Sequence, residues 1–118
     1  MDGLTICHRD ELERTGKWLL ARRSLGLSSF GMNIVEIPAG EQIPEHDEAE
    51  RDHEEVFIVL SGSAVLVVEG QEYPAPEGTL ARLDPQLRRT VINDGDDTAS
   101  VLIVSAPRSS GYQPLEWA

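Results

Sequence analysis

The sequence has little positive charge, a single cysteine and no long apolar run. Ten Lys and Arg stand against 21 Asp and Glu, so the formal net charge is −11. A charge of this sign opposes the phosphates of nucleic acids and the anionic lipids of membrane surfaces, and we expect neither as a partner. Cys7 has no second cysteine with which to form an internal disulfide. We therefore expect it to be an inert thiol, buried or half-buried.

Targeting and membrane-spanning segments are also missing. No apolar stretch reaches the roughly 18 residues of a transmembrane helix, and the start of the chain, MDGLTICHRDELERT, has no apolar stretch of signal-peptide length. These absences predict a soluble, cytoplasmic protein. A length of 118 residues is typical of one domain, large enough to bury a core. We expect a single domain over residues 1–118.

Short runs rich in Val, Ile and Leu recur about every ten residues, bounded by Gly, Pro, Asn or Asp. This pattern predicts an all-β fold in which turns such as SGS, EGQ, PAPEG and NDGDD connect antiparallel strands. Helix is expected at most as a single turn near residues 10–13. The expected strands are Leu4–Cys7, Trp18–Arg23, Phe30–Ile37, Ile43–Glu45, Val56–Leu60, Ala64–Val68, Gln71–Tyr73, Thr79–Leu83, Arg89–Ile92 and Ala99–Val104.

The stretch EHDEAERDHEEVFIVLSG, residues 45–62, crowds acidic residues and two histidines in front of an apolar run. Five residues separate Gly40 from His46, and six separate Glu55 from Gly62. These two intervals resemble the first motif of the cupin superfamily, in which a glycine precedes a His-x-His pair, a glutamate follows, and a second glycine closes the motif.

The spacing of the second cupin motif is also present in this chain, but its three central residues are substituted. Its glycine, proline, glycine, histidine and asparagine positions fall on Gly78, Asp84, Gln86, Arg89 and Asn93. The fifteen residues between the two motifs are close to the shortest separation that the family uses. The resemblance implies a cupin double-stranded β-helix, a jelly-roll-like barrel. It places the barrel core at about 30–104, with N-terminal strands in 4–24 and a tail over 105–118 that covers the barrel surface or an edge strand.

The resemblance also implies a candidate site. In cupins that bind metal, two histidines, a glutamate and the histidine of the second motif hold the ion. Here His46 matches the first histidine, Glu48 takes the place of the second, Glu55 matches the glutamate, and Arg89 stands where the last histidine would be. Arginine cannot act as a ligand, because its guanidinium stays protonated and offers only donors.

Two arrangements of this site stay open. In the first and favoured one, no metal is bound and Arg89 pairs with Glu55 or Glu48 as the counter-charge, because a guanidinium beside a dication costs on the order of a few kcal/mol. In the second, His46, Glu48 and Glu55 hold a divalent metal such as Fe, Mn, Ni or Zn. His53 is an alternative ligand if the strand into Val56 already includes it, although we expect it on a solvated loop.

The function predicted from these residues is the binding of a small anionic or oxygenated ligand in the barrel. Arg89, Glu55 and His46 would contact the ligand, and Phe57 would form part of an apolar wall. The alternative is a metal-dependent enzyme, dioxygenase-like or isomerase-like, that uses His46, Glu55 and either Glu48 or His53. A third alternative is an interaction module that forms a homodimer, as small cupins often pair through their outer sheet.

Overall fold

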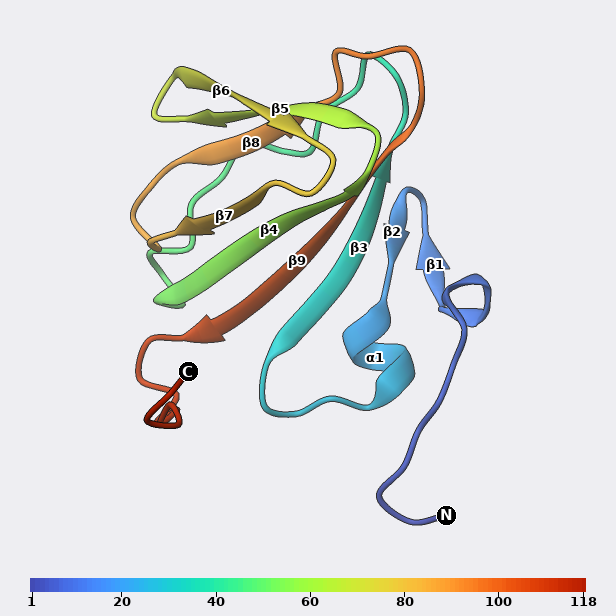
Figure 1. Ribbon diagram of the computed structural model, residues 1–118, viewed down its shortest axis with the longest axis vertical. Helices are drawn as coiled ribbons and strands as arrows, with labels where there is room; N and C mark the ends of the chain where they lie inside the picture. Colours follow the sequence, from blue (N-terminus) through green and yellow to red (C-terminus); the bar gives the residue numbers. More distant parts are fainter.

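The computed structural model describes residues 1–118, in which two antiparallel sheets face each other (Figure 1). Two short helical segments precede the main strands: the 3-10 helix η1 (Arg9–Glu11) and the helix α1 (Ala21–Leu25). Neither has the length and apolar character needed to span a membrane. The strands are β1 (Arg14–Thr15), β2 (Trp18–Leu19), β3 (Gly31–Ile37), β4 (His53–Ser61), β5 (Ser63–Val68), β6 (Gln71–Pro76), β7 (Leu80–Leu83), β8 (Arg89–Ile92) and β9 (Ala99–Pro107).

The larger sheet has the strand order β1-β2-β3-β9-β4-β7, and the smaller one has the order β6-β5-β8. Strands β4 and β9 form the longest pairing, with Val56 opposite Val104 and an irregularity after Val59. Because side chains alternate between the two faces of a strand, each long strand sends every second apolar residue into the space between the sheets. The all-β jelly-roll-like fold predicted from the sequence is confirmed.

The core between the sheets is closely packed. Its buried members come from both sheets and include Val35, Ile37, Phe57, Val59, Leu66, Val91 and Val101. The internal void among them measures only about 10 Å³, close to the smallest space that holds one water molecule. The barrel core therefore has no room for a ligand, and a polar cavity opens at the end of the barrel.

Two residues fix the ends of the strands. Gly62, between β4 and β5, has a φ of 79°, and a Cβ there would lie 2.8 Å from the Thr98 carbonyl oxygen. Only glycine tolerates both the conformation and the contact. Asn93, fully buried after β8, donates from Nδ2 to the carbonyl oxygens of Ile37 (2.8 Å) and Asp97 (2.7 Å). It thereby ties the end of β8 to the end of β3.

The N-terminal region differs most from the predicted strands. Leu4–Cys7 is extended but pairs with no strand, and Ile6 is 81% exposed, because apolar alternation alone does not supply a free sheet edge. Cys7 itself is half-buried. The strand expected at Trp18–Arg23 ends at Leu19. The chain then enters α1, which buries Ala21 and ends at a left-handed glycine.

Three other boundaries also differ. Ile43–Glu45 is not a strand: the segment around it makes only isolated bridges to β8. The expected helical turn forms slightly earlier, as η1, where His8 and Glu11 cap each other's backbone. Strand β9 continues to Pro107, so the tail begins after that residue rather than at 105. The tail then turns back, and Tyr112 lines a shallow groove with residues of β4 and β9.

Candidate functional site

Backbone pairing brings the first motif against the second. His46 and Arg89 exchange two backbone hydrogen bonds, of 3.0 Å from the His46 amide and 2.8 Å from the Arg89 amide. Two residues further on, the amide of Glu48 donates to the carbonyl oxygen of Pro85 (2.8 Å). These bonds hold the loop before β4 along β8. Glu55, on the inward face of β4, then lies beside His46 and Glu48.

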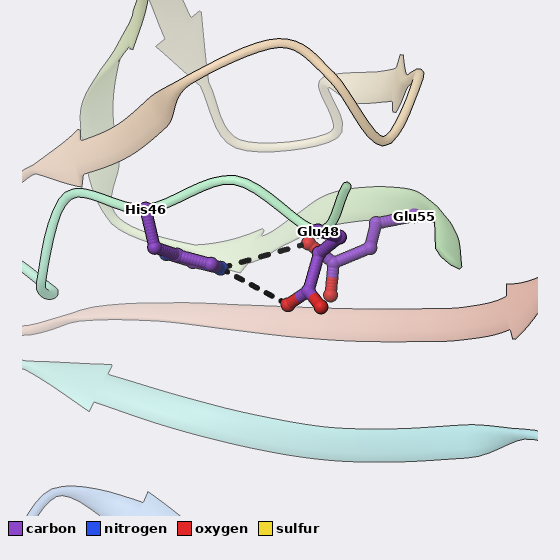
Figure 2. Close-up of side chains that lie close together, drawn as sticks. All are labelled: His46, Glu48 and Glu55. Atoms are coloured by element: carbon purple, nitrogen blue, oxygen red, sulfur yellow. Dashed lines mark ion pairs between the residues drawn. The ribbon is translucent and has the colours of Figure 1, made fainter. Parts of the chain in front are cut away.

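The three side chains form a compact group at the end of the barrel, and Figure 2 shows the His46 ring directed at both carboxylates. His46 Nε2 is 3.3 Å from Glu48 Oε1 and 4.0 Å from Glu55 Oε1. On the other side of the ring, His46 Nδ1 is 2.9 Å from the Pro44 carbonyl oxygen. Because a carbonyl can only accept, Nδ1 carries the proton in the neutral ring, and the lone pair of Nε2 faces the two carboxylate oxygens.

This group is short of positive charge. The side chain of Glu55 is only 8% exposed, and its Oε1 accepts no hydrogen bond. Burial raises the pKa of Glu55 above its ordinary value of 4.5, and the neighbouring charge of Glu48 raises that pKa further. The charges of Arg89 and His46 act in the opposite direction without cancelling the rise. A proton or a cation bound among these oxygens would remove the repulsion.

Arg89 lies behind Glu55 and faces the inside of the barrel, as the motif spacing predicts. Its side chain is 0% exposed, its Nη1 is 3.6 Å from Glu55 Oε1, and its Nη2 donates to the Asp84 carbonyl oxygen (2.9 Å). Nε and Nη1 make no hydrogen bond. The nearest charged partner of Arg89 is thus Glu55, and the guanidinium is enclosed by protein.

A polar cavity of about 500 Å³ opens beside the group, at the end of the larger sheet where β3 begins and β9 ends. Glu48 and Glu55 form part of its wall, whereas Arg89 does not line it. Most other wall residues are polar or charged, and they come from four regions of the chain: Arg22, Ser28, Ser29, Asn33, Arg51, His53 and Ser105. Of these residues, only His53 is a candidate ligand from the sequence, and the others carry no local signal.

Two expectations about this region are corrected. His53 is the first residue of β4, half-buried and on the cavity wall, not on a solvated loop, because β4 begins three residues earlier than its apolar run. It does not belong to the group formed by His46, Glu48 and Glu55. Phe57, the next inward residue of β4 after Glu55, is 3% exposed and packs in the core, so it is not a wall of this cavity.

The donor set fits a divalent metal ion. The ligand atoms of His46, Glu48 and Glu55 all lie within 4.8 Å of one another. Nitrogen and oxygen ligands lie about 2.0–2.2 Å from zinc, so two ligands of one ion are roughly 3–4 Å apart. The distances of 3.3 and 4.0 Å from Nε2 fall in this range. Imidazole and carboxylate together suit Zn, Fe and Mn.

Two antiparallel sheets around an apolar core, with an acidic and histidine group at one end, define a small barrel protein of the jelly-roll type. Residues 33–105 match the family model of the cupin domain, and the chain belongs to this family. The resemblance inferred from the motif spacing is confirmed.

Solved structures and a curated relative are similar to this chain. A cupin protein from Bacteroides fragilis has a TM-score of 0.81 and 22% identity, with 98% of this chain and 93% of that chain covered. A sugar phosphate isomerase of the cupin superfamily from Silicibacter pomeroyi has a TM-score of 0.73 and 22% identity, with 86% and 75% covered. An uncharacterized protein of Methanocaldococcus jannaschii is 24% identical over 98 residues, 82% of each chain. Structural likenesses at these identities show the fold.

Proposed function

We propose that this cupin binds a small oxygenated ligand in the cavity at the barrel end, with a divalent metal ion held by His46, Glu48 and Glu55 at its wall. One observation carries the proposal: a histidine nitrogen, which has a free lone pair when the ring is neutral, faces two carboxylate oxygens, one of which is buried and accepts no hydrogen bond. Three acceptors that face one another are stable together only with a cation or a proton among them.

The residues of the chain have distinct roles in this proposal. Held by the side chains of His46, Glu48 and Glu55, the metal ion would act as a Lewis acid and polarise an oxygen of the bound small molecule. The Pro44 carbonyl oxygen orients the His46 ring through Nδ1, and the guanidinium of Arg89, which does not line the cavity, places a positive charge 3.6 Å from Glu55 Oε1. Asn33 offers an amide on the cavity wall, where it can bond to hydroxyl or carbonyl groups of a ligand.

The polar wall also supports an oxygenated ligand over an apolar one. Only two of the residues that line the cavity are hydrophobic, and the void in the apolar core is too small for a ligand. The Silicibacter pomeroyi neighbour is a sugar phosphate isomerase, a protein that acts on a small oxygenated compound. His53, half-buried on the wall, is the candidate for proton transfer to or from such a ligand.

The test is elemental analysis by plasma mass spectrometry on tag-free protein, purified without chelator and reloaded with Fe(II), Mn(II), Ni(II) or Zn(II). We expect near-stoichiometric metal in the wild type and its loss in His46→Ala. His8→Ala is the matched control, because His8 caps η1 far from the group, and it should keep the metal. Equal metal content in the two variants would refute the assignment of His46.

A second candidate is the metal-free binding of an anionic ligand, which the position of Arg89 favours. Its Nη1 lies 3.6 Å from Glu55 Oε1 and already gives this carboxylate a positive partner. If Arg89 takes the place of the metal, the wild type takes up none of the four ions, and Arg89→His, which supplies a ligand in place of the cation, gains metal. Uptake by the wild type would rule this candidate out.

A further inference from the structure

Two arginines of this acidic protein have no carboxylate partner. The chain has ten Lys and Arg, and eight of them form ion pairs, which leaves Arg22 and Arg51. The paired residues are Arg9 and Arg14 with Glu36, Lys17 with Glu41, Arg23 with Glu13, Arg82 with Glu54 and Asp84, Arg88 with Glu45, Arg89 with Glu55, and Arg108 with Asp52.

Arg22 and Arg51 line the same cavity, the one beside His46, Glu48 and Glu55. They reach it from separate elements: Arg22 belongs to α1, and Arg51 belongs to the loop before β4. The side chain of Arg22 makes one hydrogen bond, from Nη1 to the Leu27 carbonyl oxygen (3.1 Å), and Arg51 makes none through its side chain. A guanidinium has five N–H donors, so most of their donors are free.

Two unpaired arginines on one cavity wall are unusual in so acidic a protein. With 21 carboxylates in the chain, most cations find an acidic neighbour. On this cavity wall, which Glu48 and Glu55 also line, stand the two arginines of the chain that form no ion pair with a carboxylate. An anion is repelled by most of the molecule and attracted here. The planar fork of a guanidinium matches the oxygens of a carboxylate or a phosphate and can bond to two of them at once.

We propose that the ligand of the cavity carries an oxyanion, a carboxylate or a phosphate group, which Arg22 and Arg51 hold at the cavity wall. This inference rests on the proposed function, since it names the class of ligand for the same cavity. Ser28 and Ser29, on the same wall after α1, can donate hydroxyl hydrogen bonds to the oxyanion. The remaining oxygens of the ligand then face Glu48 and Glu55. A cavity of about 500 Å³ limits the ligand to a small molecule.

The experiment is a calorimetric titration of metal-stripped protein with inorganic phosphate, with malonate and with malonamide, the neutral counterpart of malonate. We expect phosphate or malonate to bind and malonamide not to bind. The double variant Arg22→Gln/Arg51→Gln should bind the anion at least about tenfold more weakly, because each charge-assisted pair is lost. Arg22→Lys/Arg51→Lys should recover part of the affinity, because it keeps both charges.

The matched control is Arg23→Gln/Arg108→Gln, which removes two arginines from the same helix and from another exposed segment. Both are paired with carboxylates, neither lines this cavity, and the anion affinity should stay unchanged. Binding of phosphate alone identifies a phosphate-bearing ligand, and binding of malonate alone identifies a carboxylate. The inference is overturned if neither anion binds the wild type, or if the double variant and the control bind with equal affinity.

Metal content, measured separately, distinguishes this inference from the proposed metal site. Arginine-dependent anion binding in a protein that takes up no metal would support the oxyanion pocket and refute the metal assignment. Metal uptake, together with anion affinity that is the same in the wild type and in Arg22→Gln/Arg51→Gln, would support the metal site and refute the oxyanion pocket.

Discussion

The pairing of Arg89 with Glu55 makes Arg89→Ala the sharpest perturbation of the site. The guanidinium is fully buried and its nearest charged partner is the Glu55 carboxylate, 3.6 Å away and 8% exposed. Removing the arginine leaves that carboxylate in the protein interior beside Glu48, whose charge raises the pKa of Glu55, and His46, whose charge lowers it. The removed side chain also leaves a cavity beneath β4, which adds to the loss.

The expected cost follows from the burial of both partners. Breaking a buried ion pair by deleting one member lowers the free energy of unfolding by about 3–5 kcal/mol. For a domain of this size, such a loss lowers the melting temperature by roughly 10–25 °C. The cost is limited by protonation, since Glu55 can take up a proton when its pKa rises further in the variant. Each pKa unit corresponds to about 1.4 kcal/mol.

The sign of the pH dependence can be worked out from the raised pKa of Glu55. A carboxyl whose pKa is higher in the folded state favours folding fully below the unfolded pKa, and this contribution is lost as the pH rises through the folded pKa. The unfolded value is close to 4.5. The electrostatic part of the difference between the wild type and Arg89→Ala should therefore be small near pH 4.5 and should grow toward neutral pH, whereas the cavity part stays constant.

The assay is urea unfolding followed by circular dichroism, with a chelator present so that no metal replaces the missing charge. Arg82→Ala is the matched control. Arg82 is 63% exposed and pairs with Glu54 and Asp84 on the surface, so its loss should change the stability by no more than about 1 kcal/mol. If Arg89→Ala changes the stability as little as Arg82→Ala does, the buried pair does not stabilise the fold and the reasoning is wrong.

Three further predictions concern the fold. The pKa of Glu36 lies below its ordinary value of 4.5, chiefly because Arg14 donates a hydrogen bond to its carboxylate. Burial raises this pKa but does not cancel the effect of Arg14. Stability from this residue is present above pH 4.5 and is lost as the pH falls through the folded pKa, so Glu36→Gln should cost about 1 kcal/mol near neutral pH and less in acid, measured by pH-dependent urea unfolding. Gly62→Ala should cost about 2–3 kcal/mol in thermal unfolding, against about 1 for Gly70→Ala, which has a similar φ but open space around it. Asn93→Asp, which removes two buried donors, should cost about 2–4 kcal/mol by urea unfolding, and a loss below 1 would contradict the structural role assigned to its side chain.

Much of the fold could be predicted because its signals are local. The alternation that buries Val35 and Ile37, or Phe57 and Val59, is a property of one strand and needs no knowledge of its partner. Turn residues such as Gly62 mark where each strand ends, for the same local reason. The extended arm at Leu4–Cys7 alternates equally well, yet a strand also needs a free edge to pair with.

The candidate site was predicted in part. The resemblance to the two cupin motifs implied His46, Glu48, Glu55 and an inward Arg89 as candidates, and the structure brings these four residues together. The resemblance did not show that Nδ1 of His46 is occupied by a backbone carbonyl, which leaves Nε2 facing the carboxylates. The place of that carbonyl depends on how the loop before β4 folds against β8.

The sequence by itself determined the all-β class, which depends on composition and period, and the resemblance to the cupin motifs, which implied the acidic group of possible ligands. Only the tertiary structure decided that the barrel interior is filled and that a polar cavity opens at its end. It also decided that Arg22 and Arg51 meet there. Whether an arginine has a carboxylate partner depends on where every acidic residue of the folded chain lies, and no local pattern contains that information.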